Sequence, residues 1–525
     1  MNAIMIISHV ELEMVSLILV DGLMNHFVWL WENLSRAISI VAQNWAFILI
    51  GVISGMIIGT IPGMGGVVVI TILLPFTLGL DQFQAFTLLS AGIGATTFSG
   101  SITAILINTP GSASNAATLI DGYPLTQKGE SVTAITVSSI SSATGAILAS
   151  VIFVLALPLM INLVLLFGPG QIAWIILWAL IIIPFIVAER PLYGVLTASI
   201  GAMVALIGLA PQTAEPRYTL GQLILYDGVE LVAMLIGLFA IAEIVRISSL
   251  DRNTVVDFER IEMSGSIGKG IKVMLEHKWL WFKSSLIGLV VGAIPGAGGS
   301  AAAFISYAQA AQSSKQPEKF GKGTYEGIIA PESANDAKDG GQLFPTLGLG
   351  VPGSGTMAIF LGAMLMHGIF PGPSVLTQET HLVLVIAISL VISNILTSVI
   401  GLLAAEQLTA VLKVPIPLLL TAITVLALTA VFIVRGSALD VIIAIVFAII
   451  GVILIYMKIS RVPFLIAFIL ASILEHNYHL AMRFNSGSAT LAFFSGTTNL
   501  VLIGFFVVSM LIFIAPGEKI LDRFM

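Results

Sequence analysis

Residues 55–66 read GMIIGTIPGMGG, and residues 288–299 read GLVVGAIPGAGG. The two stretches share the pattern GxxxGxIPGxGG, with seven identical positions at a constant offset of 233 residues. A second pair follows in the same order, INTPGSAS at residues 107–114 and GVPGSGT at residues 350–356. Two kinds of motif, each present twice and in the same order, indicate an internal repeat. We therefore expect two structurally related halves.

The composition around these motifs is typical of a membrane protein. Hydrophobic residues make up 57% of the chain and charged residues 10%, with a mean hydropathy of +1.05, whereas soluble domains carry about 25% charged residues. Residues 37–120 contain one ionisable acid or base, Asp81, and residues 131–188 contain none. Since one span needs about 20 apolar residues, the chain holds about 11 to 14 spans or half-spans. This predicts an all-α polytopic membrane protein.

The basic residues divide the chain near its middle. Seven of the 22 Lys and Arg residues lie between Arg246 and Lys283, and the positive-inside rule predicts that this interval is cytoplasmic. We expect four parts: residues 1–45 as an amphipathic or first membrane segment, 46–245 as the first repeat half, 246–283 as the cytoplasmic linker, and 284–525 as the second half. The two halves are expected to have inverted topology, as in many transporters with internal repeats.

Several classes of function are not supported by the residues present. The chain has no cysteine, so a disulfide, a thiolate metal site and a cysteine nucleophile are excluded. It shows no clustered nucleophile with a base and no metal-ligand constellation, so neither an enzyme nor a metal site is expected. The net charge of −6 provides no basic field for nucleic acid. A channel remains the alternative to a transporter, although a channel favours pore-lining rings over paired broken hairpins.

The glycines and prolines of the motifs can be interpreted either as parts of a transport site or as packing residues. Corresponding Gly/Pro interruptions in both halves of a hydrophobic chain indicate a transport site near the middle of the membrane. Alternatively, GxxxG is common where membrane helices pack closely, and proline is a routine kink in such helices. The duplication of both motifs favours the first reading, in which each half contains a helical hairpin broken by Gly and Pro.

The motif regions, residues 59–130 and 294–373, resemble those of the large membrane subunit of the tripartite tricarboxylate transporter family. The second region includes APESANDAKDGG at residues 330–341. The resemblance implies cation-driven uptake of a small tri- or dicarboxylate across a bacterial inner membrane. It also implies a small membrane subunit and a periplasmic solute-binding protein as partners, in a lipid bilayer and without nucleic acid. No cofactor is expected apart from the coupling ion, Na⁺ or H⁺.

The two Pro-Gly-Ser segments are the predicted substrate site. A carboxylate in the membrane must be hydrogen-bonded or paired, yet the motifs contain no arginine. Proline is tolerated in a first helical turn and glycine lets the backbone approach a ligand, so free N–H groups at the start of a half-helix are expected to face the anion. The predicted substrate-binding residues are Thr109, Pro110, Gly111, Ser112, Ser114, Pro352, Gly353, Ser354, Gly355 and Thr356.

The coupling cation is expected to use oxygen atoms, because hard cations prefer oxygen ligands. Broken helices free backbone carbonyls, and Glu332 and Asp336 share one face if their segment is helical. The predicted cation-coupling residues are Gly63, Gly65, Gly296, Gly298, Glu332, Asn335 and Asp336. The alternatives are close helix packing for the four glycines and a solvated loop or cavity wall for the polar segment.

Overall fold

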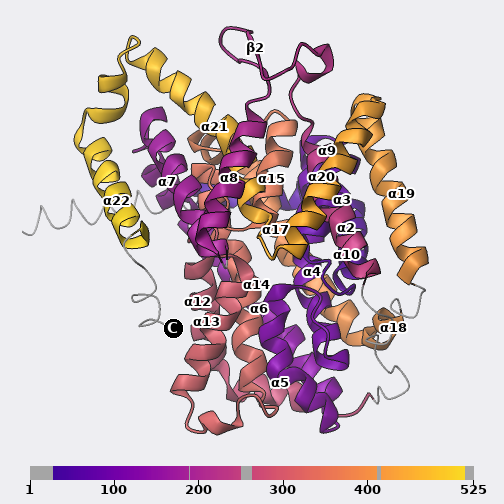
Figure 1. The fold of residues 1–525 in the computed structure, drawn as a ribbon. Helices are drawn as coiled ribbons and strands as arrows, with labels where there is room; N and C mark the ends of the chain where they lie inside the picture. Colours follow the sequence, from indigo (N-terminus) through magenta and orange to yellow (C-terminus); the bar gives the residue numbers. More distant parts are fainter. Residues whose placement is uncertain (1–27, 189, 250–262, 411–415, 515–525) are drawn as a thin grey trace, which may run out of the picture.

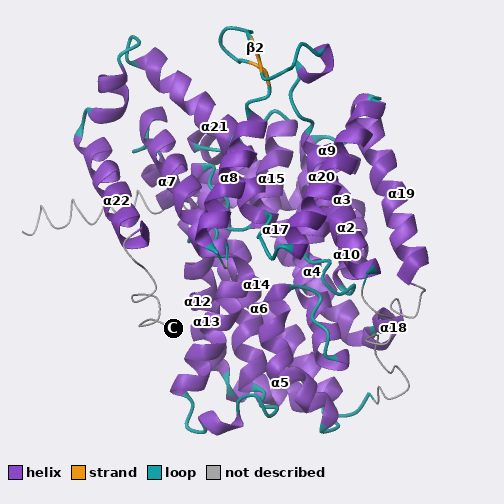
Figure 2. Ribbon diagram, viewed as in Figure 1, coloured by secondary structure: helices purple, strands orange, loops and turns teal. Residues whose placement is uncertain are grey.

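The protein is almost entirely helical (Figures 1 and 2). The computed structural model describes residues 28–188, 190–249, 263–410 and 416–514. Within these ranges, strand occurs only as one antiparallel pair, β1 (Gly208–Leu209) with β2 (Pro216–Arg217), in register Gly208 to Arg217. Helices satisfy their own backbone hydrogen bonds, which lipid requires of a spanning segment. The all-α fold class predicted from the composition is confirmed.

Among the described residues, seven helices are long and apolar enough to cross a membrane. They are α4 (Gln82–Ile107), α6 (Ser131–Val164), α7 (Pro169–Val187), the continuous helix of α9 (Leu231–Leu235), η4 (Ile236–Ile241) and α10 (Ala242–Ser248), α17 (Thr380–Leu403), α20 (Ala438–Tyr456) and α21 (Val462–Phe484). The helix Val28–Gln43 and α2 (Trp45–Gly59) together form an eighth candidate, bent by 69°. The chain is therefore a multi-pass membrane protein.

Shorter helices fill the space between these spans. The apolar ones are α3 (Gly66–Leu73) with η1 (Leu74–Thr77), α8 (Pro191–Ala205), α15 (Gly355–Met366), α19 (Ile416–Arg435) and α22 (Thr497–Ile514). The other helical segments are α5 (Ala116–Gln127), α11 (Ile267–Glu276), α12 (Lys278–Gly292), α13 (Gly298–Ser313), α14 (Glu326–Leu343), α16 (Pro373–Gln378), α18 (Ala405–Ala410), η2 (Ala113–Asn115), η3 (Leu223–Leu225), η7 (Pro317–Lys319), η8 (Phe344–Gly348) and η10 (Thr490–Phe494).

The two halves contain the same succession of helices around the motifs. In the first half, α2 leads through the IPG loop to α3, and α4 leads through the first Pro-Gly-Ser tip to α5 and α6. In the second half, α12 leads through its IPG loop to α13, and α14 with η8 leads through the second tip to α15 and α17. In Figure 1, α2, α3 and α15 lie in the upper part of the molecule, whereas α12, α13 and α5 lie in the lower part.

The GxxxG part of each motif is a packing surface. An added Cβ at Gly55 would lie 2.6 Å from the carbonyl oxygen of Gly92 in α4. In the second half, an added Cβ at Gly292 would lie 2.8 Å from the Cα of Lys338 in α14. Such distances leave no room for a side chain, so α2 lies directly on α4 and α12 directly on α14, as small residues permit.

The two halves also pack against each other. Helix α14 packs against α6, and α17 packs against both α4 and α6. At the contact between α6 and α17, the buried Ser139 hydroxyl donates to the Ser398 carbonyl at 3.2 Å, and the Ser398 hydroxyl donates to the Ser139 carbonyl at 3.1 Å. This reciprocal pair joins a helix of the predicted first half to a helix of the predicted second half.

The predicted linker is partly helical. Arg246 belongs to α10, residues 267–276 form α11, and α12 begins at Lys278, while residues 250–262 lie outside the described residues. Residues 1–27 of the predicted N-terminal segment also lie outside them. The four-part division and the cytoplasmic position of the linker stay predictions.

Candidate functional site

Three α-helices and the 3-10 turn η2, which leads directly into α5, begin at one cavity. The cavity has a volume of about 600 Å³, within the range of small-molecule sites. Its wall includes Gly66 at the start of α3, Ala113 at the start of η2, Gly298 at the start of α13 and Gly355 at the start of α15. Two of these four segments come from each half. The free N–H groups and positive dipole ends of the three α-helices thus lie around a single space.

The IPG loops hold the Pro-Gly-Ser tips in place. Gly63 has a φ of +83° and Gly296 a φ of +78°, a backbone conformation that glycine adopts without strain. The N–H of Gly63 donates to the carbonyl of Gly111 at 3.0 Å, and the N–H of Gly296 donates to the carbonyl of Pro352 at 3.2 Å. In each half, the IPG loop is therefore hydrogen-bonded to the Pro-Gly-Ser tip of the same half.

The glycine of each tip packs behind the cavity wall. An added Cβ at Gly111 would meet the Gly59 carbonyl oxygen, and one at Gly353 would lie 2.8 Å from the Gly292 carbonyl oxygen. Gly59 and Gly292 are equivalent positions of the repeat, so both tips are seated in the same way. The N–H of Gly111 donates to the Gly100 carbonyl at 3.2 Å, so this N–H is already hydrogen-bonded within the protein.

The cavity wall includes part of the predicted substrate site. The predicted residues that line it are Ser112, Ser114, Ser354, Gly355 and Thr356. The predicted residues that do not line it are Thr109, Pro110, Gly111, Pro352 and Gly353. Substrate binding by these ten residues stays a prediction. The cavity wall contains residues that follow each tip glycine, but not the tip glycine itself.

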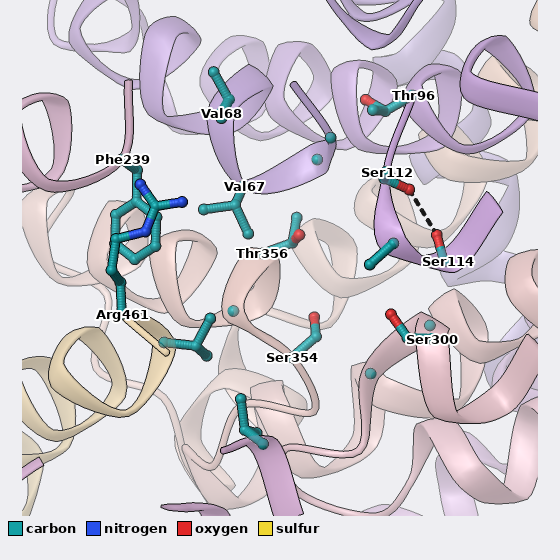
Figure 3. Close-up of a pocket in the computed structure, with 18 of the residues that line it drawn as sticks. Val67, Val68, Thr96, Ser112, Ser114, Phe239, Ser300, Ser354, Thr356 and Arg461 are labelled. Atoms are coloured by element: carbon teal, nitrogen blue, oxygen red, sulfur yellow. Dashed lines mark hydrogen bonds between the residues drawn. The ribbon is translucent and has the colours of Figure 1, made fainter. Parts of the chain in front are cut away.

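Hydroxyl groups of both tips face the cavity (Figure 3). The Ser112 and Ser114 hydroxyls lie 2.8 Å apart, and the Ser112 hydroxyl donates to Oδ1 of Asn115 at 2.6 Å. The Ser354 hydroxyl accepts a hydrogen bond from the Met357 N–H at 3.3 Å and so caps α15. A hydroxyl that accepts in this way keeps its own proton to donate to a ligand.

The cavity also contains charged side chains that the motifs do not include. Glu243 is buried, accepts from Nε of Arg246 at 2.6 Å and pairs with Arg461 at 3.0 Å. The Arg461 guanidinium lies over the Phe239 ring at 5.2 Å, as Figure 3 shows. All four residues line the cavity. One carboxylate shared by two guanidiniums leaves a net positive charge beside the first IPG loop.

The second IPG loop has a charged neighbour too. Lys338 donates to Asp339 at 2.8 Å, and Gln342 donates to the same oxygen at 2.7 Å. All three line the cavity. Three cationic side chains and two anionic ones therefore line the wall, namely Arg246, Arg461 and Lys338 against Glu243 and Asp339. This balance favours an anion.

The charged residues of the cavity wall were not predicted as site residues, but two of them have a spacing in the sequence that indicates an interaction. Glu243 and Arg246 lie three residues apart in an apolar stretch, which places them on one helical face. The positive-inside rule instead assigned Arg246 to the basic linker. Arg461 precedes an apolar helix and had no visible partner, because Glu243 lies 218 residues away.

The predicted cation-coupling residues divide into two groups. Gly63, Gly65, Gly296 and Gly298 line the cavity. Glu332, Asn335 and Asp336 are buried in α14 outside the cavity wall, with Glu332 and Asp336 one helical turn apart. Among the described residues, no group of three or more His, Cys, Asp or Glu side chains is placed to hold a metal ion. Cation coupling by these seven residues stays a prediction.

Comparisons with known proteins agree with this picture. Residues 45–466 match the family described as "Tripartite tricarboxylate transporter TctA family". An Agrobacterium vitis protein described as an uncharacterized 52.8 kDa protein in the TAR-I ttuC' 3' region is 32% identical over 450 residues, which cover 85% of this chain and 88% of that protein. An uncharacterized A. vitis protein in the TAR-II ttuC' 3' region is 33% identical over 232 residues, 44% of this chain and 96% of that protein. No solved structure matches the chain.

Proposed function

This chain belongs to the tripartite tricarboxylate transporter TctA family, and we propose that it takes up a small tri- or dicarboxylate by cation-coupled secondary transport. The family is one of transporters, so the chain is a membrane transport component and not an enzyme. Its proposed setting is a bacterial inner membrane. Its proposed partners are a small membrane subunit and a periplasmic solute-binding protein, and a sodium or proton gradient drives the uptake.

The observation that carries this proposal is the meeting of three α-helix starts and the turn η2 at one cavity. The starts of α3, α13 and α15 each offer N–H groups without a helical partner and a positive partial charge of about half an elementary charge, and the three-residue turn η2 leads directly into α5. Hydroxyls of Ser112, Ser354 and Thr356 surround the same space, and Arg246, Arg461 and Lys338 add positive charge. A substrate with two or three carboxylates can therefore be bound by both halves at once.

Uptake by reconstituted protein tests the proposal. The large subunit, its small subunit and its binding protein are placed in proteoliposomes with radiolabelled citrate or succinate as probes. We expect accumulation above the outside concentration when a sodium or proton gradient is imposed, and none without the binding protein. Equilibration without accumulation would indicate a channel or facilitator instead. Absence of any carboxylate uptake would refute the proposal.

Inverted topology is part of the proposal. Its support is the placement of α5 in the lower part and α15 in the upper part of Figure 1, although both follow a Pro-Gly-Ser tip. If the molecule spans the bilayer along this direction, equivalent turns of the two halves open to opposite sides. Such an arrangement places a substrate site at the repeat interface near the midplane.

Labelling of single cysteines tests both orientation and inversion, because the native chain has no background thiols. The exposed Gln127 ends α5 and the exposed Ser374 lies in α16, while position 257 belongs to the predicted cytoplasmic linker. We expect an impermeant thiol reagent to label S374C in intact cells and to label Q127C and D257C only after the membrane is opened. Labelling of D257C in intact cells would contradict the orientation, and labelling of Q127C and S374C from one side would contradict the inversion.

A further inference from the structure

Glu332 lies in the middle of α14 with no exposed surface, and it is hydrogen-bonded to three helices of the other half. Ser101 of α4 donates to Oε1 at 2.7 Å, Ser138 of α6 donates to Oε2 at 2.7 Å, and Thr118 of α5 donates to Oε1. We propose that Glu332 carries the proton that drives transport and that a hydrogen-bond chain through Ser101 and Asn115 links it to the substrate cavity. This inference rests on the proposed function and names its coupling site.

The environment of Glu332 contains no opposite charge to offset a carboxylate. Its hydrogen-bond partners are three neutral hydroxyls, and no described Lys, Arg or His pairs with it. A buried unpaired carboxylate is disfavoured by several kcal/mol and is relieved when it takes up a proton. Hydroxyls can donate to the ionised form and accept from the protonated form. Both states of Glu332 can therefore be hydrogen-bonded in one place.

Asp336 continues the same contact between α6 and α14. It lies one turn after Glu332, and it accepts from Ser142, which lies one turn after Ser138. Its other oxygen, Oδ1, is buried without a hydrogen-bond partner. A buried polar atom without a partner is uncommon in folded proteins. The oxygen thus has an open position for a proton beside the Glu332 site.

The remaining ionisable groups near α14 do not neutralise Glu332. Helices α4 and α6, which supply Ser101 and Ser138, contain no ionisable side chain. The titratable residues of the other helices that pack on α14, and of α14 itself, are Asp121 and Tyr123 (α5), Lys278 and Lys283 (α12), Tyr307 (α13), His381 (α17), and Glu326, Asp336, Lys338 and Asp339 (α14). Lys338 donates to Asp339, and Tyr307 donates to Asp121.

An unbroken chain of hydrogen bonds joins Glu332 to the first tip. The N–H of Ser112 donates to Oδ1 of Asn115 at 3.1 Å, which fixes the orientation of that amide. Nδ2 of Asn115 then donates to the Ser101 hydroxyl at 2.7 Å, and this hydroxyl donates to Glu332. Ser112 lines the cavity. A substrate that draws Ser112 away changes the hydrogen bond that Glu332 receives, and with it the affinity of Glu332 for a proton.

The distances favour a proton over a sodium ion. The Ser101 and Ser138 oxygens lie 2.7 Å from the carboxylate oxygens, which is the usual separation of a direct O–H···O hydrogen bond. A metal ion placed among these oxygens would have to separate them. Sodium coupling is the alternative that the experiment below distinguishes from proton coupling.

Glu332→Gln in the complete complex tests the proposal in proteoliposomes. Glutamine cannot release a proton, so accumulation driven by an imposed pH gradient is expected to fall at least tenfold. Exchange of internal for external carboxylate at equal pH is expected to continue, because exchange needs no net proton movement. The control is Ser141→Ala, a buried position of α6 that bonds to Met274 and not to Glu332, and it should retain both activities.

A readout independent of transport completes the test. A proton and a substrate that move together each raise the protein's affinity for the other. Infrared difference spectra of the wild-type protein should therefore show a protonated-carboxyl C=O band that increases when the substrate binds, and the band should be absent in Glu332→Gln. In Asn115→Ala the band should remain, but its intensity should no longer change when the substrate binds. The proposal is overturned if Glu332→Gln accumulates substrate normally, if wild-type uptake follows sodium without dependence on pH, or if the spectra of wild type and Glu332→Gln are the same. Failure of the proposed function would instead leave wild-type protein without carboxylate uptake.

Discussion

Replacement of Arg246 by alanine is expected to weaken carboxylate binding by about 10- to 100-fold, the scale of one hydrogen bond to a charged group. Arg246 lines the cavity beside the first IPG loop. Glu243 would remain paired with Arg461 at 3.0 Å, so the variant would lose positive charge at the cavity without leaving a buried carboxylate alone. Binding of radiolabelled citrate to purified protein measures the effect.

Arg217→Ala is the matched control for this variant. Arg217 also pairs with a glutamate, Glu475, at 2.7 Å, but neither residue lines the cavity. This control should bind the carboxylate as the wild type does. Equal affinities of Arg246→Ala and wild-type protein would show that the charge at the first IPG loop is not used for the substrate.

Gly353→Val is expected to abolish transport while the protein stays folded and inserted. An added Cβ at Gly353 would lie 2.5 Å from Cβ of Gln342 and 2.8 Å from the Gly292 carbonyl oxygen. The second tip would have to move, and with it the hydroxyls and N–H groups at the start of α15. Ser354→Ala removes a single hydroxyl and should weaken binding by only about 1 to 2 kcal/mol.

Gly504→Val supplies the control for added bulk. Gly504 lies in α22, and an added Cβ there meets no atom within 4 Å. This variant should transport normally in the same proteoliposome assay. If Gly353→Val also transports with unchanged apparent affinity, the seating of the second tip is not required for the site.

The breaks between helices at the Gly/Pro motifs could be predicted from the sequence because they depend on local patterns. Glycine and proline interrupt helices wherever they occur, and the spacing of Glu332 and Asp336 already placed both on one face of α14. The same patterns could not distinguish a tip glycine that touches substrate from one that packs against a helix. For Gly111 that distinction depends on Gly59, which lies on a different helix.

In the charged part of the site, the Glu243–Arg246 pair is local in the sequence, but the contacts of Arg461 could not be predicted because they join distant segments. Arg461 meets Glu243 across 218 residues, and Ser101 meets Glu332 across 231 residues. No local motif records such contacts. Asn115 is a further example, because only the fold shows that it is hydrogen-bonded to both Ser112 and Ser101.

The central claim is that both halves bind the same substrate molecule. Protection of two single cysteines by substrate tests this claim most directly. S112C and S354C place a thiol on each tip at the cavity, and S495C places one on an exposed loop before α22 as a control. Thiol alkylation is measured in the reconstituted complex at rising citrate concentrations. We predict that both tip cysteines are protected with the same midpoint while S495C is unaffected. Unchanged alkylation of both tips in protein that still transports citrate would contradict the claim.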